Sequence, residues 1–379
     1  MEPPAACGRQ PGACAIANPA QRRFCVLAEG ALGVFSSKTA VGLLRYRSAE
    51  VVAVIDSRSA GRSLGQVLGF EHPAPIVASL AAALRHRPDA LLIGIAPRGG
   101  GLPAAWRGVI RDAIQAGLDV LSGLHLFLAD DPELGALAQA HGVTLTDLRR
   151  PPGAIALPRE AGVATPHPRP FVLLTVGSDC NVGKMTASLE IVRAARAAGI
   201  DAAFGATGQT GILLAGKGIA VDRVIADFIA GATEQVIEEL GPVAWAVVEG
   251  QGSLLHPAYS GVTLGLLHGA RPDAMILCHH VGRTRIDGYG VPLPAMAELV
   301  HLYETAAAWV APARVVGLAL NGVGAPSGAL SALARAFEAE TGLPAVDPMV
   351  GAERLVESAR AEALRLGRSV HPQSLVEGG

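Results

Sequence analysis

The feature that most constrains the fold is the glycine-containing stretch TVGSDCNVGKMTASLEIVRAARAAG, residues 175–199. The apolar run PFVLLTVG leads into it and a helical periodicity follows, so we expect a strand, a tight loop and a helix. Such a turn directs main-chain N–H groups and the positive end of a helix dipole toward one point. The sequence therefore predicts a phosphate-binding loop, and Lys184 is expected to reach over the phosphate.

The loop residues expected to bind the cofactor are Gly177, Ser178, Asp179, Cys180, Asn181, Val182, Gly183, Lys184, Met185 and Thr186. Met185 is unusual, because magnesium-dependent nucleotide enzymes carry Ser or Thr at this position to bind the metal. Thr186 is the nearest substitute, but one further residue along a helix turns a side chain by about 100°. A loop that only grips a pyrophosphate needs no such hydroxyl.

The rest of the chain alternates between apolar runs and helical patterns. This alternation predicts parallel strands and an α/β fold with two parallel-sheet domains. The predicted strands are 24–30, 51–56, 90–96, 119–124, 170–177, 202–207, 244–250, 274–280 and 314–321, and the predicted helices include 37–47, 76–87 and 104–117. We expect a Rossmann-like domain over 24–150 and a P-loop domain over 170–379.

Proline-rich sequence separates these halves, and six prolines between residues 150 and 170 predict a linker over 151–169. Residues 1–23, rich in Pro, Ala and Gly, are expected to form a disordered tail. The N-terminal domain contains Gly30 and Gly33 before a predicted helix and Asp56 after the second strand. This pattern lacks one glycine of the NAD-binding motif, so NAD binding remains an alternative with incomplete support.

Composition excludes several kinds of partner. The net charge is -2 and no extended basic run occurs, so neither nucleic acid nor a membrane surface is expected as the main partner. No apolar run reaches the roughly 18 residues that span a bilayer. The five cysteines form no CxxC pair, which favours a reduced, cytoplasmic protein that acts on a small-molecule substrate.

Three segments resemble dethiobiotin synthetase. Asp179, Val182, Gly183 and Lys184 match its G-x-D-x-x-V-G-K loop, and VVEGQGSLLHP (247–257) is similar to a segment whose Glu lies beside the loop and helps to hold metal. The matching residue is Glu249. Asn321 is similar to the Asn that contacts the base, so the resemblance implies a role in cofactor binding.

The whole chain from about residue 24 resembles a family of bacterial D-glutamate N-acetyltransferases that pairs a Rossmann-like domain with a P-loop domain. Segments 27–47, 176–190, 206–234, 249–280 and 341–348 carry this resemblance, and Met185 belongs to the family pattern. The resemblance implies acetyl-CoA as the cofactor. Because coenzyme A has a pyrophosphate and no γ-phosphate, the loop is expected to hold it without the magnesium hydroxyl.

Acetylation of an amine requires a base and donors aimed at the thioester oxygen. The catalytic candidates are Glu249, His256 and His279, with His280 as an alternative to His279. Donors and cations for the substrate are expected at Gln209, Thr210, Gln251, Ser253 and Arg283, and in the N-terminal domain at Lys38 and Arg45 if the domains close over the site. No metal ligand is expected.

Two other functions remain open from the sequence. The first is an ATP- and magnesium-dependent ligase or kinase similar to dethiobiotin synthetase, and the second is a non-catalytic module that senses nucleotides. Release of free thiol from acetyl-CoA without ADP would support acetyl transfer, and release of ADP from ATP would support the ligase or kinase. Tight nucleotide binding with neither product would support the sensing module. By analogy with related P-loop domains, we expect a homo-oligomer.

Overall fold

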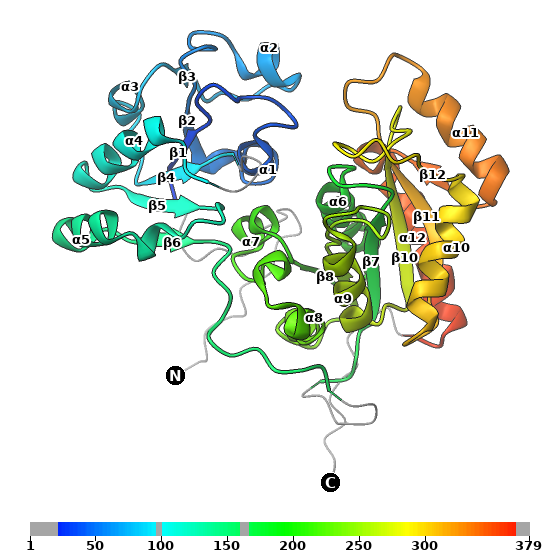
Figure 1. The fold of residues 1–379 in the computed structure, drawn as a ribbon. Coiled ribbons are helices and arrows are strands. Elements are labelled where there is room, and N and C mark those ends of the chain that lie inside the picture. The colour runs from blue at the N-terminus through cyan, green and yellow to red at the C-terminus, as the bar shows by residue number, and fades with distance from the viewer. Residues whose placement is uncertain (1–21, 96–100, 160–166, 369–379) are drawn as a thin grey trace, which may run out of the picture.

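The computed structural model describes residues 22–95, 101–159 and 167–368. It contains two six-stranded sheets in which every pairing is parallel, with helices between the strands (Figure 1). This confirms the α/β fold class predicted from the sequence. The expectation for the N-terminal tail falls almost wholly on residues 1–21, which lie outside the described residues, and so does the middle of the expected linker.

The first sheet has the strand order β3-β2-β1-β4-β5-β6. Its strands are β1 (Phe24–Leu27), β2 (Val51–Ile55), β3 (Ile76–Val77), β4 (Ala90–Ile93), β5 (Asp119–Ser122) and β6 (Leu145–Asp147). Its α-helices are α1 (Lys38–Tyr46), α2 (Leu64–Leu68), α3 (Leu80–Leu84), α4 (Ala104–Gln115) and α5 (Pro132–His141). In this order the chain reverses direction across the sheet beside β1, the place where such sheets bind ligands.

The second sheet has the order β12-β11-β10-β7-β9-β8. Its strands are β7 (Phe171–Gly177), β8 (Ala202–Gly205), β9 (Trp245–Val248), β10 (Ala274–His280), β11 (Arg314–Asn321) and β12 (Ala345–Val346). Its α-helices are α6 (Lys184–Ala197), α7 (Gln209–Ala215), α8 (Ile229–Glu238), α9 (Ser260–Ala270), α10 (Met296–Ala308), α11 (Ala329–Thr341) and α12 (Pro348–Arg365). The chain reverses beside β7, which ends in the glycine loop.

Strand β7 shows why the sequence forms a sheet that is covered on both faces. All seven of its residues are buried, so its apolar run does not alternate with polar residues. Helices α6 and α12 contact each other, as do α8 and α9. They belong to two separate apolar clusters that use alternate residues of β7, such as Leu173 and Leu174.

The prediction of one helix over 76–87 was wrong. Ile76 and Val77 form the edge strand β3, and the helix α3 begins only at Leu80. The Ser79 side chain accepts a hydrogen bond from the Ala82 N–H and so fixes the start of this helix. Two β-branched residues before a capping serine favour a strand followed by a new helix.

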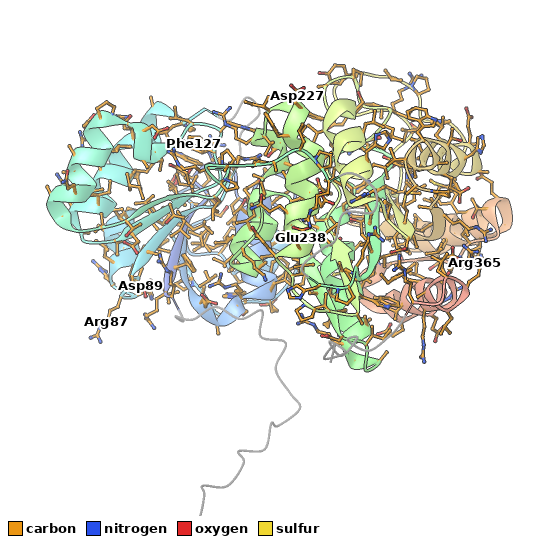
Figure 2. All side chains as sticks on the ribbon, turned by 90° about the horizontal axis from the view of Figure 1, so that it is seen from below. Arg87, Asp89, Phe127, Asp227, Glu238 and Arg365 are labelled. Carbon is orange, nitrogen blue, oxygen red and sulfur yellow. The ribbon has the colours of Figure 1, made fainter. Side chains whose placement is uncertain are left out.

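The two domains share one apolar core cluster. It joins β1 and α1 of the first domain to α6, α7 and α12 of the second. Figure 1 shows α1 and α7 between the two sheets, and side chains fill this region in Figure 2. Phe127, labelled in Figure 2, lies 5.0 Å from the guanidinium of Arg223 in the second domain. The first domain is therefore packed against the second through extensive contacts.

No helix in the described part of the chain combines the length and the apolar character that crossing a membrane requires.

Candidate functional site

The glycine loop has the backbone shape of an anion-binding nest. Asn181 and Gly183 adopt left-handed φ angles of 60° and 104°, and α6 begins at the next residue, Lys184. Successive N–H groups in such a conformation point into one concavity at a helix start. Gly183 meets this need for a positive φ without strain. Val182 between them is buried in the shared core and anchors the loop.

Lys184 folds back over the loop. The residue is 7% exposed, and its ammonium donates a hydrogen bond to the Asp179 main-chain oxygen at 2.8 Å. Burial lowers the pKa of Lys184, and the nearby carboxylates of Asp179 and Glu249 act in the opposite direction. A compact ammonium in this position can transfer its donors to a phosphate when one enters the loop.

A buried ion pair holds the first half of the loop. The Asp179 carboxylate accepts hydrogen bonds from the Cys180 N–H at 2.6 Å and the Asp287 N–H at 2.8 Å, and Arg283 pairs with it at 3.0 Å. Arg283, expected to bind the substrate, is thus engaged in shaping the loop. Its sequence position after β10 gave no sign of this partner.

The residues around Ser178 also support the loop. The Ser253 hydroxyl donates to the Ser178 carbonyl at 3.1 Å, and His279 Nδ1 lies 2.9 Å from the Ser178 hydroxyl. Burial, followed by the neighbouring His280 and Arg283, lowers the pKa of His279 to about 4. A histidine with this pKa remains neutral near pH 7 and is a weak base, so the geometry gives it a supporting position.

Met185 and Thr186 face the N-terminal domain. A Cβ added at Gly42 of α1 would lie 3.6 Å from the Met185 Cε, and Met185 packs against the shared core. Thr186 lies beside the Tyr46 hydroxyl, which donates to Glu190 at 3.1 Å. The position that binds magnesium in nucleotide enzymes is therefore used here for packing between domains.

Glu249 follows β9 and lies next to the loop. The residue is 6% exposed, and its carboxylate accepts hydrogen bonds from the N–H groups of Thr207 at 3.3 Å and Gly208 at 3.2 Å. Burial raises its pKa to about 7, although these donors, Gln251 and Lys184 act in the opposite direction. A carboxylate with this pKa is suited to accept and release a proton at neutral pH.

The expected substrate donors separate into two groups. Gln251 lies beside Glu249 and donates to the Thr207 hydroxyl at 3.2 Å. Thr210 instead shares a hydrogen bond of 2.9 Å with Thr39 of α1, and Gln209 lies against Gly123 of the N-terminal domain. These two residues join the domains.

His256 is buried between aromatic rings. Its ring stacks on Tyr259 with the centroids 4.4 Å apart and meets the edge of Tyr289 at 5.0 Å. Its Nδ1 accepts the Ala258 N–H at 3.2 Å, so the neutral ring carries its hydrogen on Nε2 and acts there as a donor. This arrangement suits stabilisation of negative charge better than removal of a proton.

His256 also belongs to a set of possible metal ligands. Ligand atoms of Asp179, Cys180 and His256 lie within 4.8 Å of one another. The carboxylate of Asp179 is already committed to Arg283, however, and Lys184 lies close by. These positive charges oppose a bound cation, and we assign no metal to this set.

Asn321, at the end of β11, lies beside the loop. A Cβ added at Gly183 would lie 3.5 Å from the Asn321 side chain, whose oxygen accepts the Val323 N–H at 3.1 Å. The side chain thus stands at the mouth of the loop, where it can contact a bound cofactor.

Two cationic residues of the N-terminal domain complete the site, and the sequence gave weak or no sign of them. Lys38, at the start of α1, donates a hydrogen bond to the Asn181 side chain. Arg149 follows β6 and is 6% exposed, and its charge interacts with Glu249 and Lys38. Burial lowers its pKa to about 10. Arg45, in contrast, lies over the Phe70 ring, away from the loop.

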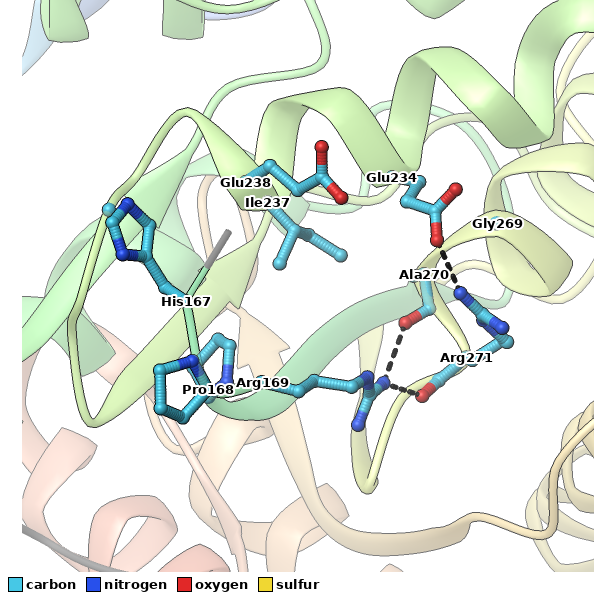
Figure 3. A pocket seen from close by; sticks show the side chains of 11 residues that line it. His167, Pro168, Arg169, Glu234, Ile237, Glu238, Gly269, Ala270 and Arg271 are labelled. Carbon is cyan, nitrogen blue, oxygen red and sulfur yellow. Dashed lines mark hydrogen bonds and ion pairs between the residues drawn. The ribbon is translucent and has the colours of Figure 1, made fainter. Parts of the chain in front are cut away.

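A separate pocket lies near the start of β7, at the opposite end of the strand from the glycine loop (Figure 3). Arg271 pairs with Glu234 within its lining, whereas Arg169 and Glu238 pair with residues outside the lining, Asp273 and Arg159. Because its charges are paired and the loop chemistry lies elsewhere, we place the candidate site at the glycine loop.

Fold and site together define a two-domain α/β protein whose P-loop faces a Rossmann-like domain. Residues 162–356 match the family model described as the DUF1611_C P-loop domain, and residues 57–151 match the DUF1611_N Rossmann-like domain. The chain belongs to this family of DUF1611 proteins. This agrees with the family predicted from the sequence.

Two curated relatives are named D-glutamate N-acetyltransferase. The protein of Tritonibacter scottomollicae is 38% identical over 336 residues, which cover 86% of this chain and 95% of the relative. The protein of Pseudoalteromonas sp is 39% identical over 273 residues, which cover 72% of this chain and 81% of that relative. A crystal structure of a DUF1611 family protein from Anabaena variabilis is 40% identical, with a TM-score of 0.84 over 90% of this chain and 99% of that chain.

Proposed function

We propose that the protein is an N-acetyltransferase that acetylates the amino group of a D-amino acid, with D-glutamate as the acceptor and acetyl-CoA as the donor. Two relatives with this acceptor in their names support the reaction class. The donor is implied by the resemblance to D-glutamate N-acetyltransferases, and the role of the loop is inferred from the site itself. A cytoplasmic location, where acetyl-CoA is available, forms part of the proposal.

The observation that carries the proposal is the orientation of Met185 and Thr186. Met185 has no hydroxyl and packs against α1 of the N-terminal domain, and the Thr186 side chain interacts with Tyr46 of the same helix. Neither residue therefore offers a hydroxyl to magnesium at the loop. The nest and Lys184 remain, and they suit a diphosphate that is held but not cleaved. Coenzyme A carries such a diphosphate.

Glu249 is the proposed base. The acceptor amine must lose a proton before it attacks the thioester carbon, and a carboxylate with a pKa of about 7 can take this proton at neutral pH. The new C–N bond replaces the C–S bond, and coenzyme A leaves as a thiol after it receives a proton. His256 is the proposed donor to the thioester oxygen as negative charge develops there.

Arg149 is a proposed partner for an acceptor carboxylate. It is buried on the N-terminal side of the site and interacts with Glu249, so an anion held there would lie near the base. Its Nε donates to the Gly123 carbonyl at 2.7 Å and another nitrogen pairs with Asp222, which together fix the guanidinium. A fixed guanidinium suits recognition of a carboxylate.

The test compares two reactions of the same purified protein. Acetyl-CoA and D-glutamate are expected to yield free thiol and acetylated glutamate of the corresponding mass, with L-glutamate as the stereochemical control. ATP, magnesium and D-glutamate are expected to yield no ADP. Formation of ADP without thiol would replace the proposal with an ATP-dependent ligase or kinase.

A further inference from the structure

Two lysines approach the glycine loop from different domains. Lys184 of the P-loop domain donates to the Asp179 main-chain oxygen at 2.8 Å, and Lys38 of the N-terminal domain donates to the side-chain oxygen of Asn181. The two acceptors are two residues apart on the loop. The chain has only three lysines, so two of them converge on one short segment.

The charges of the two lysines are only partly compensated, since Glu249 acts on both ammonium groups, and Asp179 on that of Lys184, from beyond ion-pair distance. In the described part of the chain, no carboxylate lies within ion-pair distance of either ammonium, and the acid of the loop, Asp179, is bound by Arg283 at 3.0 Å. Burial by the surrounding protein lowers the pKa of Lys38, although its side chain keeps solvent-exposed surface, and the ammonium of Lys184 lowers it further. Crowded like charges are costly unless an anion lies between them.

The two helix starts also favour an anion. Helices α1 and α6 both begin with a lysine, and neither has an acidic residue in its first turn. The start of a helix carries partial positive charge, which a lysine does not offset and an anion does. A ligand with two negative charges would therefore relieve repulsion between the lysines and between each lysine and its helix.

We propose that Lys38 is a second diphosphate-binding residue, supplied by the N-terminal domain, so that the diphosphate of the coenzyme lies between Lys38 and Lys184. This inference rests on the proposed function, in which acetyl-CoA brings the diphosphate. Asn181 holds Lys38 at the mouth of the loop through a neutral amide, which an incoming phosphate oxygen replaces. The carboxylate of the acceptor is the competing anion for Lys38.

The experiment compares Lys38→Ala with Lys217→Ala. Lys217 is exposed on the P-loop domain and donates to the Glu239 carbonyl, so its removal controls for the loss of one positive charge. Calorimetry gives the Kd of coenzyme A, and initial rates give KM for acetyl-CoA, for S-acetylpantetheine, which has no diphosphate, and for D-glutamate.

Lys38→Ala is expected to weaken coenzyme A binding about tenfold or more and to leave KM for S-acetylpantetheine unchanged. Lys217→Ala is expected to change neither by more than about twofold. Lys38→Gln, with thermal unfolding of both variants, provides a second substitution if alanine disturbs the start of α1. The neutral glutamine is expected to reproduce the loss of affinity.

Three results would overturn the inference. If Lys38→Ala raised KM for D-glutamate with both donors while the Kd of coenzyme A stayed unchanged, Lys38 would bind the acceptor. If no constant changed in a folded variant, Lys38 would bind neither. If the wild-type protein failed to bind coenzyme A, the proposed function would fall as well, and this outcome is distinguishable from the first two.

Discussion

The loops after β1 and β7 are the same structural unit used in two ways. Each follows the first strand of a parallel sheet, and each leads into a helix that begins with a lysine, Lys38 or Lys184. The loop after β7 turns tightly through left-handed Asn181 and Gly183 and forms a nest. The loop after β1, residues 28–37, is longer, and its Gly30 N–H binds Asp56 at 2.7 Å. In the proposed function, the loop after β7 binds the anion and the loop after β1 directs Lys38 toward it.

The strands that pair with β1 and β7, namely β2 and β9, are also followed by residues with different hydrogen-bond partners. Each is followed by a buried carboxylate, Asp56 after β2 and Glu249 after β9. Asp56 accepts the Gly30 N–H of the loop after β1, so a carboxylate of the protein itself binds that loop. Glu249 instead accepts the N–H groups of Thr207 and Gly208, which follow β8 and lie outside the glycine loop, and its carboxylate interacts with Lys184. In the proposed function, Asp56 therefore has a structural role and Glu249 a chemical one.

The largest expected difference in kcat is between the amide variants of Glu249 and Asp56. Glu249→Gln is expected to lower kcat by about 10²–10⁴-fold, because the amide cannot accept the proton of the amine. Asp56→Asn is expected to lower stability and to leave kcat within about threefold. Steady-state rates and thermal unfolding of both variants measure this. Equal losses of kcat would remove the chemical distinction between the two positions.

Removal of Lys184, the lysine at the glycine loop, has the next largest expected effect. Lys184→Ala is expected to weaken coenzyme A binding by about 10–100-fold, since charge-assisted hydrogen bonds to a buried ligand contribute about 1.5–3 kcal/mol. Calorimetry with coenzyme A measures the loss. Unchanged affinity would show that the loop has another ligand. The proposed difference between the two loops, that only the loop after β7 binds the diphosphate, would then be wrong.

The pH dependence of the reaction reports on Glu249 directly. With a pKa of about 7, kcat is expected to rise about tenfold per pH unit below pH 7 and to level off above it, since the base must be ionised.

The effect of Glu249 on the free energy of unfolding has the opposite sign. Because the folded-state pKa is raised from 4.5, the favourable contribution is present at low pH and is lost as the pH rises through about 7. Glu249→Gln is expected to remove this pH dependence of the unfolding temperature, and its persistence in that variant would point to another group.

The smallest expected effect concerns Met185. Met185→Ala is expected to lower the free energy of unfolding by about 1–2 kcal/mol, because a half-buried side chain is lost from the contact with α1. Met349→Ala, at an exposed position on α12, is the matched control and is expected to change little. Met185→Ser is expected not to produce ATP hydrolysis. Hydrolysis in that variant would mean that packing between the domains does not determine the chemistry of the loop.

The sequence by itself determined the local features of this protein. Apolar runs indicated most of the strands. The glycine loop with Lys184 could be predicted because turns and helix starts depend on residues that are neighbours in the sequence. The edge strand at Ile76 was missed because two residues are too few to show a period. Glu249 was singled out because VVEGQGSLLHP (247–257) resembles a segment of dethiobiotin synthetase.

Only the tertiary structure decided which distant residues meet. Lys38 reaches a loop residue 143 positions away, and Arg283 reaches Asp179 from 104 positions away. Met185 packs against α1 instead of standing beside a phosphate. Such contacts follow from how two sheets and their helices pack together, which no local pattern encodes, and the raised pKa of Glu249 follows from the burial that this packing produces.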